Sequence, residues 1–161
     1  MVKTSGKRKG YKVFGLLESF TGCFFYQGQD GRLNSAASIA FLTRVLERTT
    51  QSIVLIQNGA KYHTNAEKQA FFAQQAARLQ VFQLPTYSPD DNPIEKLWKK
   101  IKQQDIHLHY FPTFEALTDK VERALLTFAN IPEKILAHCW YFPSTPLAHQ
   151  WPVHRGEVRR G

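Results

Sequence analysis

The chain has 161 residues, of which 43% are hydrophobic and 13% aromatic, and its formal net charge is +8. This composition excludes a disordered segment and suits one globular domain, while the charge favours a polyanionic partner, chiefly nucleic acid. No run approaches the roughly 18 apolar residues of a membrane span, and no apolar segment follows the basic residues 1–10, so we expect a soluble cytoplasmic protein.

The first half of the chain predicts an alternation of strands and helices. Residues 11–19 and 23–27 are apolar and aromatic and flank Thr21-Gly22, which predicts a hairpin. A helix is expected over residues 34–48, capped by Asn34 or Ser35. The continuous apolar run 52–57 predicts a strand covered on both faces. A helix over residues 65–79 and a strand over 80–84 follow.

The second half is predicted to be helical after a proline-rich loop. Asn92 and Pro93 suit the N-cap and first position of a helix over residues 93–102. Its apolar residues recur at helical spacing and predict one buried face. Helices over 114–130, capped by Thr113, and 132–140 complete an α/β domain of residues 1–140. The remaining tail, 141–161, is rich in proline and arginine; it covers the domain, packs on a partner or is disordered.

One stretch carries a recognisable pattern. Residues 85–98 read PTYSPDDNPIEKLW. They closely resemble the P-x-Y-S-P-x-x-N-P-I-E-x-x-W signature of DDE transposases, in the bacterial insertion-sequence branch of the mariner-like superfamily. The resemblance implies a ribonuclease H-like fold, a mixed sheet flanked by helices, in which Glu95 is the third acidic metal ligand. It also implies that the usual first strand, the centre of that sheet, is missing at the N-terminus.

The second acidic position of that family is altered here. Residues 57–63 read QNGAKYH and resemble an Asp-Gly/Asn-Ala-x-x-His motif, with Asn58 at the aspartate position. The first acid belongs to the missing strand. Glu18 and Asp30 lie on or near the hairpin and are not promoted to that role, whereas Asp91 is left open as an indirect contributor to the metal site.

The resemblance implies two Mg²⁺ or Mn²⁺ ions that clamp a phosphodiester between carboxylates. Glu95 and Asn58 are the expected catalytic and metal-binding positions, but an amide carries no charge, so metal affinity should fall. We therefore expect a DNA strand-cleavage and strand-transfer domain of a transposase that is weak or inactive as a nuclease. The alternative is a non-catalytic module that binds DNA or interacts with an intact transposase.

Basic residues near these motifs are the candidates for DNA contact, with a solvated surface as the other interpretation: Lys61, His63, Lys99, Lys102, Arg159 and Arg160. Trp98 is expected in the core rather than stacked on DNA. Because a sheet without its centre exposes an edge, we expect that edge to be covered by a second copy that exchanges strands, or else by the tail. The expected setting is nucleoid DNA in a prokaryotic cytoplasm.

Overall fold

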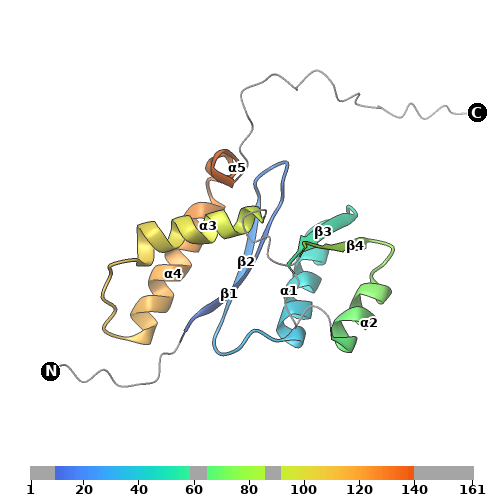
Figure 1. Ribbon diagram of the computed structural model, residues 1–161, viewed down its shortest axis with the longest axis horizontal. Helices are drawn as coiled ribbons and strands as arrows, with labels where there is room; N and C mark the ends of the chain where they lie inside the picture. The colour runs from blue at the N-terminus through green and yellow to red at the C-terminus, as the bar shows by residue number, and fades with distance from the viewer. Residues whose placement is uncertain (1–9, 59–64, 86–91, 140–161) are drawn as a thin grey trace, which may run out of the picture.

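The structure is a computed structural model that describes residues 10–58, 65–85 and 92–139 (Figure 1). After an initial pair of strands, helices and strands alternate as far as β4, and the elements after it are helical: β1 (Lys12–Leu17), β2 (Phe24–Gln29), α1 (Ser35–Glu47), β3 (Ile53–Gln57), α2 (Ala66–Gln74), β4 (Leu79–Gln83), α3 (Pro93–Ile101), the π-helical turn η3 (Lys102–Ile106), α4 (Phe114–Ala129) and α5 (Pro132–Cys139). The predicted α/β order is confirmed.

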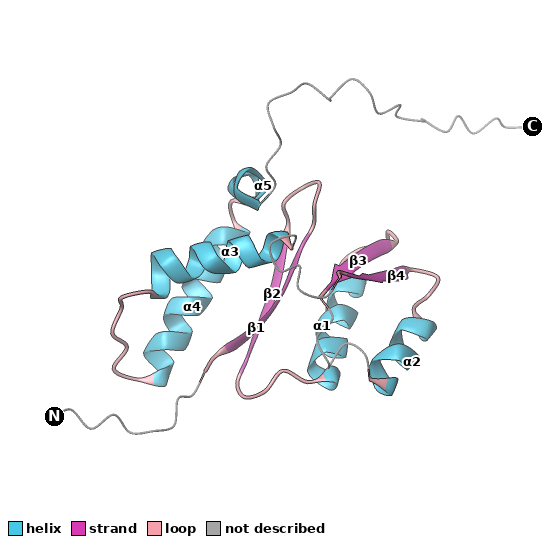
Figure 2. Cartoon of the chain, viewed as in Figure 1, coloured by secondary structure: helices cyan, strands magenta, loops and turns pink. Residues whose placement is uncertain are grey.

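The four strands form two separate sheets. β1 and β2 pair antiparallel, with Lys12 opposite Gln29, while β3 and β4 pair parallel, with Ile53 opposite Leu79. Helices α3, α4 and α5 lie beside the hairpin, and α1 and α2 lie beside β3 and β4 (Figure 2). Both pairing senses of a mixed sheet are therefore present, and among the described residues no strand joins the two pairs.

The hydrophobic core forms two clusters, one on each face of the hairpin of β1 and β2. One cluster joins β2 to α3, α4 and α5, and its most buried members are Leu97, Leu125 and Ile135, each 0% exposed. The other joins Phe14 of β1 to α1, where the ring of Phe14 stacks on that of Phe41 at 5.7 Å between centroids. Burial of each such side chain contributes about 1.5–3 kcal/mol.

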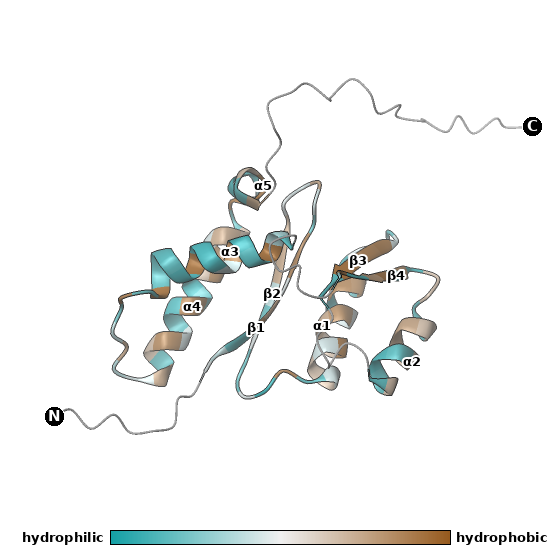
Figure 3. Ribbon diagram, in the orientation of Figure 1, coloured by the Kyte–Doolittle hydropathy of each residue, from teal (hydrophilic) through white to brown (hydrophobic). Residues whose placement is uncertain are grey.

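One face of β3 and β4 is left open among the described residues. Val54 and Ile56 are 62% and 61% exposed, and Phe82 of β4 is 56% exposed. Figure 3 shows both strands among the most hydrophobic parts of the chain. Parallel strands are usually covered on both faces, and the sequence predicted as much for residues 52–57. The structure corrects that expectation for the described part of the chain.

Two predicted helix caps are confirmed. The Asn34 side chain accepts a hydrogen bond from the N–H of Ala37, at 2.8 Å, and Thr113 accepts one from Ala116, at 3.1 Å. These bonds satisfy donors that the first turn of a helix leaves without partners. Asn92 holds the N-cap position of α3 through its backbone carbonyl, which accepts from Glu95, and its side chain makes no capping bond.

The second helix is shorter than predicted. Residues 65–79 were expected to be helical, but α2 ends at Gln74 and Leu79 already belongs to β4. The Arg78 side chain donates to the carbonyls of Leu46 and Thr49, and its own carbonyl accepts from Ile53 at 2.7 Å. Residues 75–79 include good helix formers, which is why the sequence predicted a longer helix. Pairing with β3 overrides that local preference.

The signature helix continues further than predicted. Residues after 102 were expected to form a loop, but η3 adds a wider turn in which the N–H of His107 donates to Lys102, at 2.6 Å. Ile106 follows the buried Ile101 at five residues, the spacing of a π turn, and packs against the same core cluster. Asp105 in this turn pairs with Lys120 of α4 at 3.0 Å.

Candidate functional site

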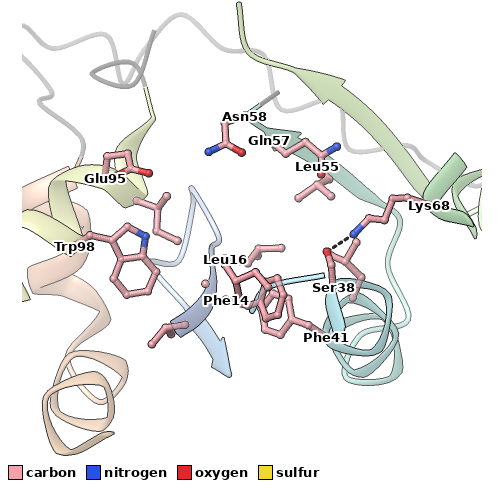
Figure 4. A pocket seen from close by; sticks show the side chains of 15 residues that line it. Phe14, Leu16, Ser38, Phe41, Leu55, Gln57, Asn58, Lys68, Glu95 and Trp98 are labelled. Carbon is pink, nitrogen blue, oxygen red and sulfur yellow. Dashed lines mark hydrogen bonds between the residues drawn. The ribbon is translucent and has the colours of Figure 1, made fainter. Parts of the chain in front are cut away.

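A pocket of about 260 Å³ lies between the two sheets. Its walls come from β1, α1, β3, α2 and α3 (Figure 4). The side chains are mainly apolar at the floor, with polar groups on opposite sides: Val13, Phe14, Gly15, Leu16, Leu33, Ser38, Phe41, Leu42, Leu55, Gln57, Asn58, Lys68, Ile94, Glu95 and Trp98. The pocket thus draws on segments that are far apart in the sequence.

Glu95 and Asn58 face one another across this pocket (Figure 4). Asn58 directly follows β3, and Glu95 lies in the first turn of α3. Both residues are exposed, so their oxygen atoms are accessible to a ligand. The two positions that the sequence predicted as a pair therefore line the same pocket, although the residue numbers between them include a further helix and strand.

A glycine lets the signature helix lie close to β1. A Cβ atom at Gly15 would be 2.5 Å from the Trp98 ring and 2.8 Å from Ile94. Trp98 also packs edge-on against Phe24, at 5.7 Å between ring centroids, so it belongs to the core as predicted. Because Ile94 and Trp98 flank Glu95 on α3, their contact with Gly15 fixes where the carboxylate sits.

The ligand set matches a hard cation in type but not in number. Glu95 supplies one carboxylate and Asn58 one neutral carbonyl oxygen, and Mg²⁺ favours such oxygen ligands. No group of three His, Cys, Asp or Glu side chains suited to a metal occurs in the part of the chain that the structure describes. One negative charge does not fit a pair of divalent cations.

Glu18 has a structural role instead. Its carboxylate accepts hydrogen bonds from the N–H of Phe20, at 2.9 Å, and from the N–H and hydroxyl of Thr21, so it closes the hairpin turn. Partial burial raises the pKa of Glu18, but these hydrogen bonds outweigh burial and hold the pKa below its ordinary value. The Glu18 carboxylate is therefore engaged by the hairpin turn.

Two buried polar side chains lie away from Glu95. Lys68 of α2 is 0% exposed, donates a hydrogen bond to the Ser38 hydroxyl and lies 5.3 Å from the centroid of the Phe72 ring. Burial lowers the pKa of Lys68 to about 8. Gln57 is 7% exposed, and its Nε2 has no hydrogen-bond partner among the described residues. Neither residue was predicted as part of a site.

A second, more open pocket of about 720 Å³ adjoins the first along α3 and η3. Its lining is mainly basic and polar: Glu95, Lys96, Trp98, Lys99, Lys102, Gln103 and His107. Lys99 and Lys102, both predicted to contact DNA, are exposed here. His107 was not predicted, because the sequence placed it in a loop, whereas η3 brings it beside the two lysines.

Four other candidates for DNA contact lie outside the described residues: Lys61, His63, Arg159 and Arg160. So does Asp91. The tail 141–161 lies outside them as well. Across the residues described, no helix has the length and apolar character needed to cross a membrane.

Residues 1–118 match the family model described as DDE superfamily endonuclease. The chain belongs to this family. The resemblance predicted from residues 85–98 is therefore confirmed. The chain is similar to a curated protein of Shigella sonnei, the insertion element IS630 uncharacterized 39 kDa protein. The two are 28% identical over 133 residues. That alignment spans 81% of the chain but only 38% of the relative.

Solved structures of transposases share the fold. The Mos1 transposase paired-end complex with left transposon end has a TM-score of 0.58 at 15% identity, covering 86% of this DDE endonuclease-family chain and 46% of that one. The structure of the Mos1 transposase catalytic domain and raltegravir with Mg has a TM-score of 0.53 at 15% identity, with 82% and 83% covered. The predicted ribonuclease H-like α/β fold class is confirmed.

Proposed function

We propose that this chain is the strand-cleavage and strand-transfer domain of a DNA transposase, and that its chemistry is impaired. The observation that carries the proposal is that Glu95 and Asn58 face one another across one pocket (Figure 4). Membership of the DDE endonuclease family supports the class of reaction. The neutral amide at Asn58 supports the impairment, since phosphodiester cleavage in this class depends on carboxylates that bind divalent cations.

The proposed roles of the chain's own residues are limited to binding and orientation. Glu95 would offer its carboxylate, and Asn58 its amide oxygen, to Mg²⁺ or Mn²⁺, which would supply charge stabilisation at a phosphodiester. The choice of ion is supported by the solved structure of the Mos1 transposase catalytic domain and raltegravir with Mg. Ile94 and Trp98 hold Glu95 at the pocket through their contact with Gly15. With a single carboxylate, the site binds such ions weakly.

A DNA nicking assay tests this proposal. Purified wild-type chain should show no metal-dependent nicking of supercoiled plasmid above background in Mn²⁺, because one carboxylate cannot hold the ions. Asn58→Asp should raise nicking, and Asn58→Asp with Glu95→Gln should abolish the gain. Asn130→Asp, at an exposed helix end, is the matched control for added charge. Wild-type nicking that Glu95→Gln abolishes would contradict the impairment.

A second candidate is DNA binding without chemistry. The specific observation in its favour is the open pocket along α3 and η3, where Lys99, Lys102 and His107 lie together. Such groups bind phosphates regardless of sequence. We propose that four further residues also contact DNA: Lys61, His63, Arg159 and Arg160.

Three proposals concern the whole chain. The domain ends near residue 140, two copies of the chain associate, and the protein acts on nucleoid DNA in a bacterial cytoplasm.

A further inference from the structure

The connection between η3 and α4, residues 107–113, presents two large side chains to solvent. It lies at the outer edge of the molecule, where it leads from the end of the α3 ribbon to the start of α4 (Figure 1). Leu108 is 94% exposed and Tyr110 is 88% exposed. Among the described large hydrophobic side chains, only Phe20, in the turn between β1 and β2, is exposed to a similar degree. Because burial of such side chains stabilises a fold, their exposure here contributes nothing to stability.

The backbone of this connection holds Leu108 in a conformation that is unfavourable for leucine. Its φ is 64°, the one positive φ among the described non-glycine residues. Glycine and asparagine adopt the left-handed region more readily, because a larger side chain crowds the following carbonyl. The N–H of His109 donates to the Ile106 carbonyl at 3.2 Å, and the Nδ1 of His109 donates to the His107 carbonyl at 3.1 Å. Hydrogen bonds therefore close around Leu108, and a strained residue that is held outward is typical of a binding position.

Basic groups lead from the candidate site to this connection. Lys99, Lys102 and His107 line the open pocket along α3 and η3, which Glu95 also lines. Leu108 directly follows His107 in the chain. At about 1.5 Å of rise per residue, the distance from Glu95 to His107 along the helix is roughly 18 Å. A DNA strand rises about 3.4 Å per nucleotide, so a strand that follows these groups from Glu95 reaches Leu108 after about five nucleotides.

The two exposed side chains suit the faces of unpaired bases. Phosphates are bound by charged and polar groups, so an apolar side chain beside the lysines adds nothing to that contact. In a duplex the base faces are covered by stacking, whereas an unpaired base offers its face to a tyrosine ring or to an inserted leucine. Two side chains are too few for a protein interface, which buries about 800 Å² on each partner. The positive charge beside them matches a polyanion.

We propose that Leu108 and Tyr110 bind unpaired bases of a DNA strand, with Tyr110 stacked on one base and Leu108 inserted beside it. The phosphates of that strand lie along Lys99 and Lys102. The ligand is single-stranded DNA, or a duplex with unpaired bases about five nucleotides from the phosphodiester held near Glu95. The inference rests on the proposed DNA-binding surface of α3 and η3 and adds to it a preference for unpaired DNA. It does not depend on metal binding or on cleavage.

Binding of two labelled DNAs to the full chain in EDTA, followed by fluorescence anisotropy, tests this inference. One DNA is a fully paired duplex, and the other has the same number of phosphates and a central run of unpaired thymines. The wild type should bind the unpaired DNA more tightly. Tyr110→Ala should weaken that binding about tenfold and leave duplex affinity within about twofold, whereas Tyr110→Phe keeps the ring and should keep the affinity. Phe20→Ala removes a ring of similar exposure from another turn and should change neither affinity.

Leu108→Asn separates binding from stability. Asparagine tolerates a positive φ, so this variant should bind the unpaired DNA several-fold more weakly without a lower free energy of unfolding in urea. In the wild type, 2-aminopurine placed at successive unpaired positions should lose fluorescence where it stacks on Tyr110, and Tyr110→Ala should restore that fluorescence. Equal affinity of the wild type for both DNAs, or an equal loss in Tyr110→Ala and Phe20→Ala, would overturn the inference.

A double variant, Lys99→Gln with Lys102→Gln, distinguishes this failure from failure of the proposed DNA-binding surface. If it weakens binding of both DNAs while Tyr110→Ala changes neither, the surface stands and the base-stacking inference is wrong. If the double variant changes neither affinity, the DNA lies on another part of the molecule and both proposals are wrong.

Discussion

At the scale of single residues, charge decides what the pocket can hold. Glu95 brings one negative charge to the pocket, and Asn58, at the position that we infer to be an aspartate in the family motif, brings a neutral amide of similar shape. An aspartate-to-asparagine change keeps an oxygen ligand but removes a full charge, and the attraction between a divalent cation and one such charge about 4 Å away amounts to about 2 kcal/mol even in water. Lys68 shows the reverse situation, a buried cation without a carboxylate among the described residues.

At the scale of elements, the site depends on how closely α3 lies against β1. Gly15 has no side chain where a Cβ would meet Trp98 at 2.5 Å and Ile94 at 2.8 Å. The rigid Trp98 ring is itself held against Phe24 in the core. The glycine therefore couples the hairpin to the start of the signature helix.

Gly15→Ala should lower the free energy of unfolding by about 1–3 kcal/mol, because the added methyl group overpacks this contact. Urea unfolding followed by tryptophan fluorescence measures the effect. Gly10→Ala is the matched control, since a Cβ there meets only the end of the Lys12 side chain, at 3.8 Å. An unchanged unfolding free energy for Gly15→Ala would show that α3 is not held by this contact.

Local patterns predicted most elements, and pairing over long distances explains the exceptions. The caps at Asn34 and Thr113 follow from side-chain chemistry and were predicted correctly. The end of α2 was not, because the pairing of Leu79 with Ile53 is set by a strand far away in the sequence. The turn η3 depends on the five-residue spacing from Ile101 to Ile106, which the helical period does not reveal.

The candidate site was predicted only where a motif carried it. The signature at residues 85–98 indicated Glu95, and the motif at residues 57–63 indicated Asn58; the structure brings both to one pocket. Lys68 and Gln57 were missed, since their burial follows from packing between α2, α1 and β3. One signal was present for Lys68: it precedes Phe71 and Phe72 at three and four residues, which places it on the apolar face of its helix.

At the scale of the whole molecule, the net charge of +8 favours binding to DNA. The open pocket along α3 and η3 places basic side chains beside Glu95 of the candidate site. Lys99 and Lys102 are both exposed there, on the same side as Glu95. Binding led by phosphate contacts releases counterions, so affinity should fall steeply with salt.

Lys99→Gln with Lys102→Gln should weaken binding to duplex DNA of any sequence and reduce the slope of log affinity against log salt by about two. Anisotropy of a labelled duplex over a salt series measures this. Lys134→Gln, at an exposed position of α5, should leave the slope unchanged. An identical slope for the double variant would place the DNA on another surface.

The most direct test of the proposed metal site is calorimetric titration of Mn²⁺ into the wild type, Asn58→Asp and Asn58→Asp with Glu95→Gln. If Glu95 and Asn58 face one another as ligands short of charge, Asn58→Asp should tighten metal binding about tenfold or more, and removal of the Glu95 charge should reverse most of that gain. Equal affinity for all three proteins would contradict the assignment of this pocket as the metal site.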